Sequence, residues 1–242
     1  PEVWKVGSGD ILDFITLDYL AETGKPIIFS SGMSTLEETE KAIAFLKSKD
    51  AQPILLHCVS KYPCPPEELN LNTIKFYNEK FDIPIGFSDH SIENDAAVAA
   101  VALGAKVIEK HFTLSRELYG ADHKVSQTPE EFKQLVKRIR EVETNPKNKQ
   151  KVLNSELTKR SLGTSEKTLN EDEAVFRPLF RKSLMAGQNI SAGTTLTKEM
   201  IYAMRPQQHA GGLPSEELTN VLGKTTKINL KRFDPITNEA IK

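Results

Sequence analysis

Short apolar runs alternate with longer amphipathic segments over the first 143 residues of this chain. Each apolar run ends in a loop that is polar or contains glycine, and the segment that follows places apolar residues at helical spacing. Strands that alternate with helices at this cadence predict an α/β fold with a parallel sheet. The predicted strands span residues 3–6, 27–30, 53–58, 83–87 and 105–109.

Local signals define several of the predicted helices. Ser34 and Glu37 form a capping box at the start of a helix that runs to about residue 49. Thr128 and Glu131, with a proline between them, give a later helix the same start. The segment 94–103 consists almost entirely of Ala and Val, which predicts a helix packed closely on the sheet, with a glycine after it as its stop.

The pattern changes after residue 143. Residues 144–176 are rich in Lys, Asn, Ser and Glu and contain few apolar anchors, which predicts an interdomain linker. Residues 177–242 contain short apolar runs separated by turn residues, which predicts a small, mostly β domain. The sequence therefore divides into residues 1–143, 144–176 and 177–242.

Composition narrows the class of protein. The 242 residues are 38% hydrophobic and 27% charged with a net charge of −1, which is typical of a soluble globular protein. The near-neutral charge gives no electrostatic argument for nucleic acid or a membrane surface as a partner. No apolar run approaches the ~18 residues of a transmembrane helix. Cys58 and Cys64 form no disulfide framework, so we expect reduced thiols in a cytoplasmic protein.

Two histidines carry the main candidate chemistry. His90 and His111 each follow the carboxyl end of consecutive predicted strands, where α/β folds place their active sites. A single histidine in such a loop is most simply a hydrogen-bonded structural residue, but two at matching strand ends favour a shared site. Neutral imidazoles with few other protein ligands suit a divalent metal that keeps open positions for substrate and water.

The first β-α loop is a weaker candidate for an anion site. Gly7 and Gly9 let the backbone approach an anion, while Ser8 and Lys5 add a hydroxyl donor and a positive charge. On the residues alone, such a loop serves equally well as a simple turn. The role of Tyr62 also has two interpretations, because the residue could equally anchor the loop as a half-buried side chain or contact a ligand.

Three motifs point to a family. GFSDHS at 86–91, GAKVIEKHFT at 104–113 and GADHKVS at 120–126 resemble, in order and spacing, the sialic acid synthases. These enzymes condense phosphoenolpyruvate with N-acetylmannosamine or a related sugar. The resemblance implies a (β/α)8 TIM barrel followed by a SAF (antifreeze-like, β-clip) domain, with only the last five β-α units of the barrel present here. The three earlier units would precede Pro1, so we expect the chain alone to lack activity and to aggregate or recruit a partner.

The resemblance also implies roles for individual residues. His90 and His111 would bind the metal, with Mn²⁺ implied by the family and Mg²⁺ or Co²⁺ compatible with imidazole ligands. Phosphoenolpyruvate contacts would come from Lys5, Ser8, Ser30 and Ser88. Sugar contacts would come from Asp10, Ser60, Tyr62 and Asp122, and Asp122 would also be a catalytic residue together with His90 and His111. Arg205 would reach the active site of the neighbouring subunit in a homodimer whose SAF domain caps the partner barrel.

Three departures from the family pattern concern the sugar side of the site. Asp10 stands where many members carry Glu, Ser60 replaces an amide, and residues 207–210 are inserted after the Arg205-Pro206 pair. The identity of the sugar stays open between N-acetylmannosamine and the diacetamido-trideoxy sugars.

Two other functions are compatible with the sequence. One is a different phosphoenolpyruvate or pyruvate aldol enzyme, in which Lys110 would form a Schiff base. The other is a non-catalytic protein whose SAF-like domain binds ice or a carbohydrate. Its many charged residues, such as Lys224, Lys227 and Arg232, argue against an ice-binding face.

Overall fold

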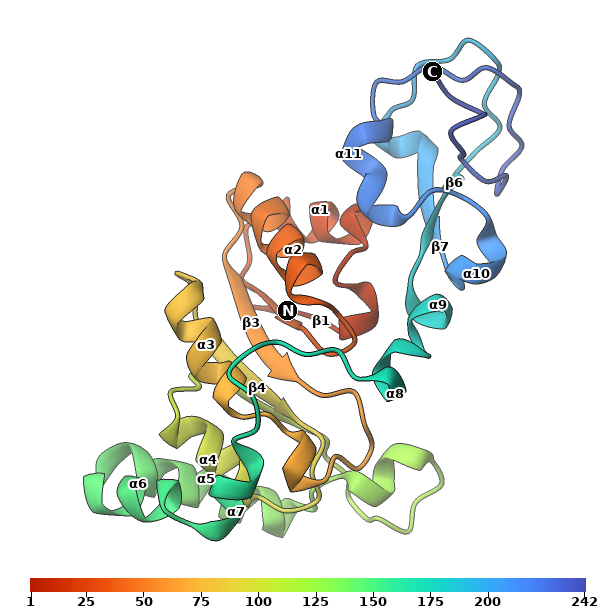
Figure 1. Cartoon of the computed structure of the whole chain (residues 1–242). Helices are drawn as coiled ribbons and strands as arrows, with labels where there is room; N and C mark the ends of the chain where they lie inside the picture. The colour runs from red at the N-terminus through yellow and green to blue at the C-terminus, as the bar shows by residue number, and fades with distance from the viewer. The chain divides into compact units, whose positions relative to one another are not determined.

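The computed structural model describes all residues from 1 to 242 (Figure 1). Seven strands are present, the first five in the α/β region. The strands are β1 (Trp4–Val6), β2 (Ile27–Ser30), β3 (Pro53–Cys58), β4 (Ile85–Asp89), β5 (Ile108–Lys110), β6 (Ser183–Ala186) and β7 (Ile201–Met204). The helices are α1 (Phe14–Ala21), α2 (Leu36–Ser48), α3 (Asn72–Lys80), α4 (Asp95–Ala102), α5 (Pro129–Thr144), α6 (Pro146–Leu153), α7 (Glu156–Ser161), α8 (Glu171–Ala174), α9 (Arg177–Phe180), α10 (Gln207–Ala210) and α11 (Leu218–Val221). Short 3-10 turns lie at Ser8–Asp10, Pro66–Glu68, Ala121–Val125, Lys198–Met200 and Ser215–Glu217.

The first five strands form one sheet in chain order, which confirms the predicted α/β class with a parallel half-barrel sheet. β3 pairs with β4, and β4 pairs with β5, both in parallel. The bounds of β4 and β5 differ most from the prediction: β4 spans Ile85–Asp89 where 83–87 was expected, and β5 spans Ile108–Lys110 where 105–109 was expected. Hydrogen bonding extends β4 through the polar residues Ser88 and Asp89, which an apolar-run criterion leaves out of a strand.

Gly86 allows β4 to lie between its neighbours. A Cβ atom at this position would lie 2.4 Å from the Val107 carbonyl oxygen and 2.4 Å from a Leu56 methyl carbon. Any side chain here would therefore force the strands apart, which explains a glycine inside an otherwise apolar strand.

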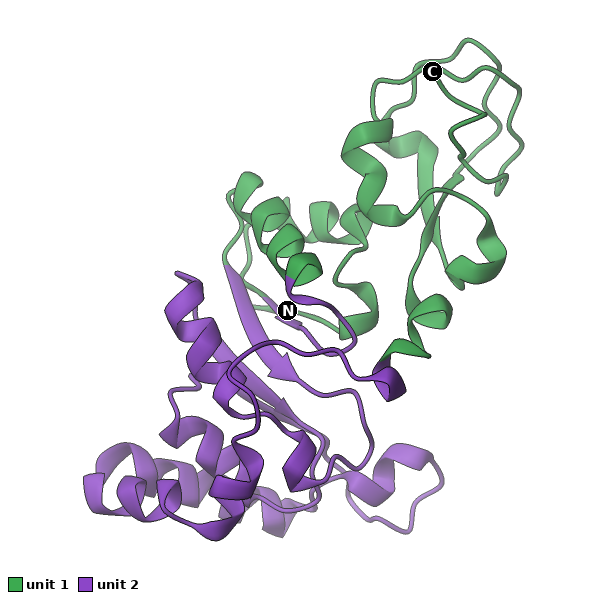
Figure 2. Ribbon diagram, in the orientation of Figure 1, with its two compact units in different colours: residues 1–27, 37–52, 174–242 green, residues 28–36, 53–173 purple.

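The chain forms two compact units, which Figure 2 distinguishes by colour. Unit 1 contains residues 1–27, 37–52 and 174–242, and unit 2 contains residues 28–36 and 53–173.

Unit 2 has a helical layer around α4. The small residues of α4 pack against Leu135 and Val142 of α5, with Val152 and Leu153 of α6 beside them. The Thr128 capping box of α5 is confirmed, because the side chains of Thr128 and Glu131 each accept a hydrogen bond from the other residue's backbone N–H. The segment predicted as a linker contributes α6 and α7 to this layer. Their few apolar residues are too sparse to indicate helices, yet Val152 and Leu153 of α6 pack against the cluster formed by α4 and α5.

In unit 1, the segment 177–242, predicted as a mostly β domain, contains the strands β6 and β7 together with the short helices α9, α10 and α11. β6 pairs antiparallel with β7, with Ser183 opposite Met204 and Ala186 opposite Ile201. Isolated bridges such as Ile190 to Leu230 and Thr226 to Ile241 take the place of longer strands. Among all helices of the structure, none combines the length and apolar character needed to cross a membrane.

Candidate active site

The register of β4 and β5 brings the two predicted histidines together in unit 2. Asp89 pairs with Lys110 at the carboxyl end of both strands, so the next residue in each chain segment is a histidine. The ring centroids of His90 and His111 lie 5.4 Å apart, with the rings inclined at 64°. The predicted meeting of two imidazoles at one edge of the sheet is therefore found.

Hydrogen bonding defines which nitrogen of His90 is available. Its Nδ1 lies 2.7 Å from the Val59 carbonyl oxygen, an acceptor only, so Nδ1 carries the proton and donates. The Nε2 atom then keeps its lone pair. This arrangement, with one ring nitrogen fixed by a backbone carbonyl and the other open, is typical of metal-ligating histidines.

Both imidazoles are biased toward the neutral form. Burial lowers the pKa of His90, which the hydrogen bond to Val59 only partly offsets. Burial also lowers the pKa of His111, and the neighbouring His90 adds to that effect. Metal binding needs neutral imidazole, so the donor chemistry fits a divalent ion. No group of three His, Cys, Asp or Glu side chains is placed to hold a metal ion, so water or substrate oxygens would have to complete its coordination.

Tyr62 covers the histidine pair. Its ring centroid lies 4.0 Å from that of His90 and 5.6 Å from that of His111, edge-on to the latter. Loss of hydration is the main cause that raises the pKa of Tyr62, and nearby negative charges such as Asp122 add to it. The phenol therefore stays protonated and can donate a hydrogen bond to a bound molecule.

Asp122 also lies beside the pair, as predicted. One of its carboxylate oxygens is 3.9 Å from Nδ1 of His111, and its side chain is 73% exposed. It can therefore reach a ligand from the open side.

The three predicted serines of this unit differ in their partners. The Ser88 hydroxyl donates to Glu109 at 2.8 Å. The Ser60 backbone N–H donates to a Glu173 oxygen at 2.6 Å. The Ser30 hydroxyl is buried at the end of β2 and has no hydrogen-bond partner. A buried hydroxyl without a partner costs free energy, so Ser30 is the serine most suited to receive an anionic ligand.

Lys110 is a buried structural cation. Its side chain is 1% exposed, and its ammonium donates to Asp89 at 2.7 Å, to the Ser91 carbonyl at 2.7 Å and to the Glu93 carbonyl at 2.9 Å. Three acceptors use all three N–H bonds. The ammonium holds the loop after β4, and the geometry leaves no lone pair for attack on a ketone.

The remaining predicted residues lie in unit 1. Arg205 donates to both oxygens of Asp10, at 2.7 and 2.9 Å. The Lys5 ammonium donates to the Val6 carbonyl at 2.9 Å, and the Ser8 carbonyl accepts from Arg181 at 3.3 Å. Arg205 was predicted to reach a neighbouring subunit, whereas here it pairs with Asp10 of its own chain.

Sequence reasoning did not identify two residues that the structure adds to these clusters. Lys182 pairs with Asp10 at 3.0 Å and with Asp13 at 2.6 Å. Glu173 contacts the loop after β3 through Ser60. The partner of Lys182 could have been found, because Asp13 stands at a helix N-cap and accepts from the Thr16 N–H. Nothing in the linker sequence indicates that Glu173 is buried.

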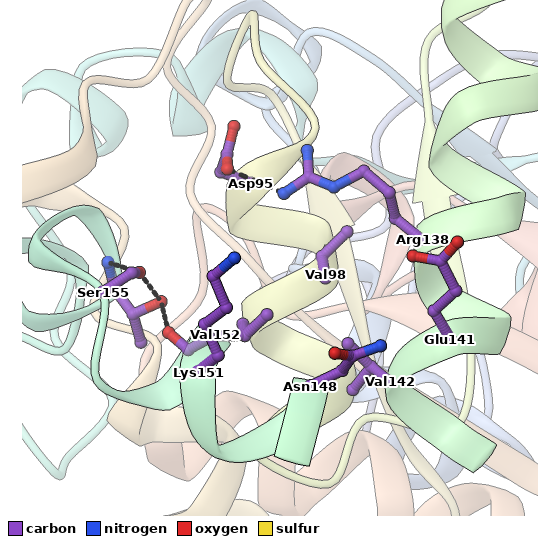
Figure 3. A pocket seen from close by; sticks show the side chains of 10 residues that line it. Asp95, Val98, Arg138, Glu141, Val142, Asn148, Lys151, Val152 and Ser155 are labelled. Atoms are coloured by element: carbon purple, nitrogen blue, oxygen red, sulfur yellow. Dashed lines mark hydrogen bonds and ion pairs between the residues drawn. The ribbon is translucent and has the colours of Figure 1, made fainter. Parts of the chain in front are cut away.

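A separate hollow of about 290 Å³ in unit 2 contains none of the predicted residues (Figure 3). It lies between α4, α5, α6 and α7 above the apolar side chains of Val98, Val142 and Val152. Arg138 at its rim is already paired with Asp95 at 2.8 Å. The hollow therefore offers less chemistry than the histidine edge.

Comparison with known families gives two matches. Residues 1–151 match the NeuB family, and residues 181–242 match the SAF domain.

Individual relatives agree with these matches. N-acetylneuraminate-9-phosphate synthase of Mus musculus is 36% identical over 239 residues, which cover 98% of this chain and 62% of that protein. N,N'-diacetyllegionaminic acid synthase of Legionella pneumophila is 34% identical, covering 93% of this chain and 60% of that protein. The crystal structure of the spore coat polysaccharide biosynthesis protein SpsE of Bacillus subtilis matches with a TM-score of 0.83 at 32% identity, covering 100% of this chain and 68% of that one. The chain thus spans about three fifths of the length of the two named synthases.

Proposed function

Because this chain belongs to the NeuB family, we propose that it carries the reaction centre of a nonulosonic acid synthase. The reaction is the condensation of phosphoenolpyruvate with N-acetylmannosamine or a related acetamido sugar, giving a nonulosonic acid and phosphate. The relatives that carry such names include synthases for sialic, legionaminic and pseudaminic acids. The observation that carries the proposal is the pair of neutral, closely spaced imidazoles at the carboxyl edge of β4 and β5.

The bond changes are those of an aldol-like condensation. C3 of phosphoenolpyruvate attacks the aldehyde carbon of the open-chain sugar, so a C–C bond forms and the aldehyde oxygen gains a proton. Water adds at C2, and phosphate leaves. His90 and His111 would hold a divalent ion, with Mn²⁺ as the proposed ion, which would supply Lewis-acid polarisation of the aldehyde oxygen.

The side chains of unit 2 then have distinct tasks. Ser30, with its unpartnered buried hydroxyl, donates to the phosphate or carboxylate of phosphoenolpyruvate. Ser88 is already a donor to Glu109, so it can offer the substrate only its oxygen lone pairs in this arrangement. Tyr62 and Asp122 orient the sugar beside the imidazoles. This orientation lowers the entropic contribution to the activation free energy of the condensation. Lys5 and Ser8 remain the proposed additional contacts to phosphate.

The proposal includes a complete (β/α)8 barrel and a homodimer. The family resemblance implies that Arg205 of the SAF domain reaches the active site of the partner subunit. Within this chain Arg205 pairs with Asp10, a proposed sugar contact, which supports a place for Arg205 beside the sugar. In the proposed dimer, this contact forms between subunits, with each SAF domain capping the partner barrel.

The two alternative functions fit the contacts less well. A Schiff-base aldol enzyme would need Lys110 to give up Asp89 and two carbonyl acceptors within a buried site. An ice-binding face would have to be flat and uncharged, whereas Lys224, Lys227, Lys231 and Arg232 are all exposed.

The test is phosphate release from phosphoenolpyruvate in the presence of a panel of acetamido sugars and Mn²⁺. In a protein with the complete barrel, we expect release with at least one sugar and none after chelation of the metal. Trapping of pyruvate on Lys110 by borohydride, with no phosphate release, would favour the Schiff-base alternative instead.

A further inference from the structure

Glu173 is a nearly fully buried carboxyl group that neither family match covers. It lies in α8, between the NeuB match that ends at residue 151 and the SAF match that begins at residue 181. Only 1% of the residue is exposed. Oε1 accepts the backbone N–H of Ser60 at 2.6 Å, and Oε2 is buried without a hydrogen-bond partner.

This arrangement is costly if its only purpose is to attach the connector. Burial removes the hydration of a carboxyl group, and one hydrogen bond replaces only part of that hydration. A contact selected for stability alone would be expected to satisfy both oxygens. The position of Glu173 therefore suggests a role in the loop that it contacts.

That loop follows β3 and contains Tyr62, whose ring packs on His90. The residue before Glu173 contacts it as well, because Asp172 lies 3.4 Å from the Lys61 ammonium. Tyr62 comes next in the chain, and its ring lies 4.0 Å from the ring of His90. Glu173 is thus connected to the imidazoles through a short series of contacts: the Ser60 amide, the loop backbone and the Tyr62 ring.

We propose that Glu173 is a positioning residue of the candidate site. By accepting the Ser60 N–H, it fixes the loop after β3 so that Tyr62 stays over His90 and His111. Its catalytic consequence rests on the proposed function, since Ser60 and Tyr62 are the proposed sugar contacts. The positioning itself does not depend on that function and can be measured in the absence of substrate.

Amide hydrogen exchange measures the contact directly. The variants are Glu173→Ala, which removes the acceptor, and Glu173→Gln, which keeps a side-chain oxygen. Glu171→Gln is the matched control, because it removes one exposed carboxylate from the same helix. We expect Ser60 exchange to become faster by about tenfold or more in Glu173→Ala, with an intermediate effect in Glu173→Gln. The Phe87 amide, bonded to Val107 in the sheet, should change much less, which separates a local effect from global destabilisation.

The ring signals of His90 report the consequence for the site. Tyr62 lies close enough to shift the His90 carbon-bound protons by its ring current. Glu173→Ala should move these signals toward their positions in Tyr62→Leu, and Glu173→Gln should retain most of the shift. Unchanged Ser60 exchange or unchanged His90 signals in Glu173→Ala would overturn the proposal.

Kinetics separate this inference from the proposed function. In an active synthase, Glu173→Ala should raise KM for the sugar by about tenfold while KM for phosphoenolpyruvate changes little. An equal change in both KM values would contradict positioning through the sugar-binding loop. If phosphate release is absent even in the unaltered protein with a complete barrel, the proposed function fails, while the exchange and ring-shift results still decide the role of Glu173.

Discussion

Two polar clusters in this molecule differ in how much of their hydrogen-bonding and ligand-binding capacity the protein itself already uses. At the edge of β4 and β5, His90 and His111 face each other with lowered pKa values, and His90 keeps an open Nε2. In unit 1, Asp10 is already neutralised by Lys182 and Arg205. The first cluster has a nitrogen lone pair that no group of the protein uses, whereas the charges of the second cluster are already paired with one another. A candidate site is therefore better identified by unused donors and acceptors than by the number of charges it contains.

The largest expected effect concerns the histidine edge. Replacing His90 or His111 by Ala should lower turnover by roughly a thousandfold, because the loss of Lewis-acid stabilisation amounts to several kcal/mol. Both side chains lie just beyond strand ends, so circular dichroism should show unchanged secondary structure, although removal of the buried His90 leaves the Val59 carbonyl without its donor. His209→Ala, at an exposed position, is the control. Near-normal metal-dependent turnover in either variant would remove that histidine from the ligand set.

The ion pairs of unit 1 should matter for stability in proportion to their burial. Lys182→Met leaves Asp13, whose side chain is 1% exposed, without its cation, and should lower the free energy of unfolding by roughly 3 kcal/mol. Arg205→Ala removes a partly exposed pair and should cost less than about 1 kcal/mol. Urea denaturation of both variants measures the two values. Equal losses would show that burial does not distinguish these pairs.

His57 tests whether a buried imidazole alone indicates a site. It donates from Nε2 to the Leu69 carbonyl at 2.7 Å, and burial lowers its pKa from 6.5 to about 3. The unfolded chain takes up a proton near pH 6.5, whereas the folded protein resists protonation until about pH 3. The unfolded state thus binds more protons in this window, so stability should fall by roughly 1.4 kcal/mol for each pH unit below 6.5.

The measurement is urea denaturation from about pH 7.5 to about pH 5, a range that begins above the unfolded pKa of histidine and extends below it. His57→Gln should reduce the slope of stability against pH and leave the part contributed by His90 and His111, because it removes one titrating group while keeping a donor for the Leu69 carbonyl. His209→Gln should leave it as in the unaltered protein. A His57→Gln variant with the original slope would place the acid sensitivity elsewhere.

The smallest expected effect concerns assembly. If the Arg205–Asp10 contact also forms between subunits, mixing an Arg205→Ala chain with a His90→Ala chain should restore partial activity in heterodimers. Recovery should be at most about half of the unaltered level, since one of the two sites in each heterodimer stays defective. Absence of recovery, with subunit exchange demonstrated by mass spectrometry, would restrict the contact to a single chain.

The sequence was most informative where local pattern determines structure. The short apolar runs predicted five strands that the sheet confirms, and parallel register then required His90 and His111 to be neighbours. Residues whose role depends on distant partners were beyond its reach. Glu173 contacts a loop 113 positions earlier in the chain, and its neighbours in sequence give no indication of its burial. The helices α6 and α7 were not predicted, because an amphipathic pattern this short cannot be distinguished from a polar linker.

The most direct test of the account is Mn²⁺ binding followed by electron paramagnetic resonance. We expect a bound Mn²⁺ signal in the unaltered protein and in His209→Ala, and its loss in His90→Ala and in His111→Ala. Because burial lowers the pKa of both histidines, binding should persist below pH 6.5, the pKa of an ordinary imidazole, and disappear only at lower pH. Bound Mn²⁺ that survives in both histidine variants would contradict the assignment of this edge as the reaction centre.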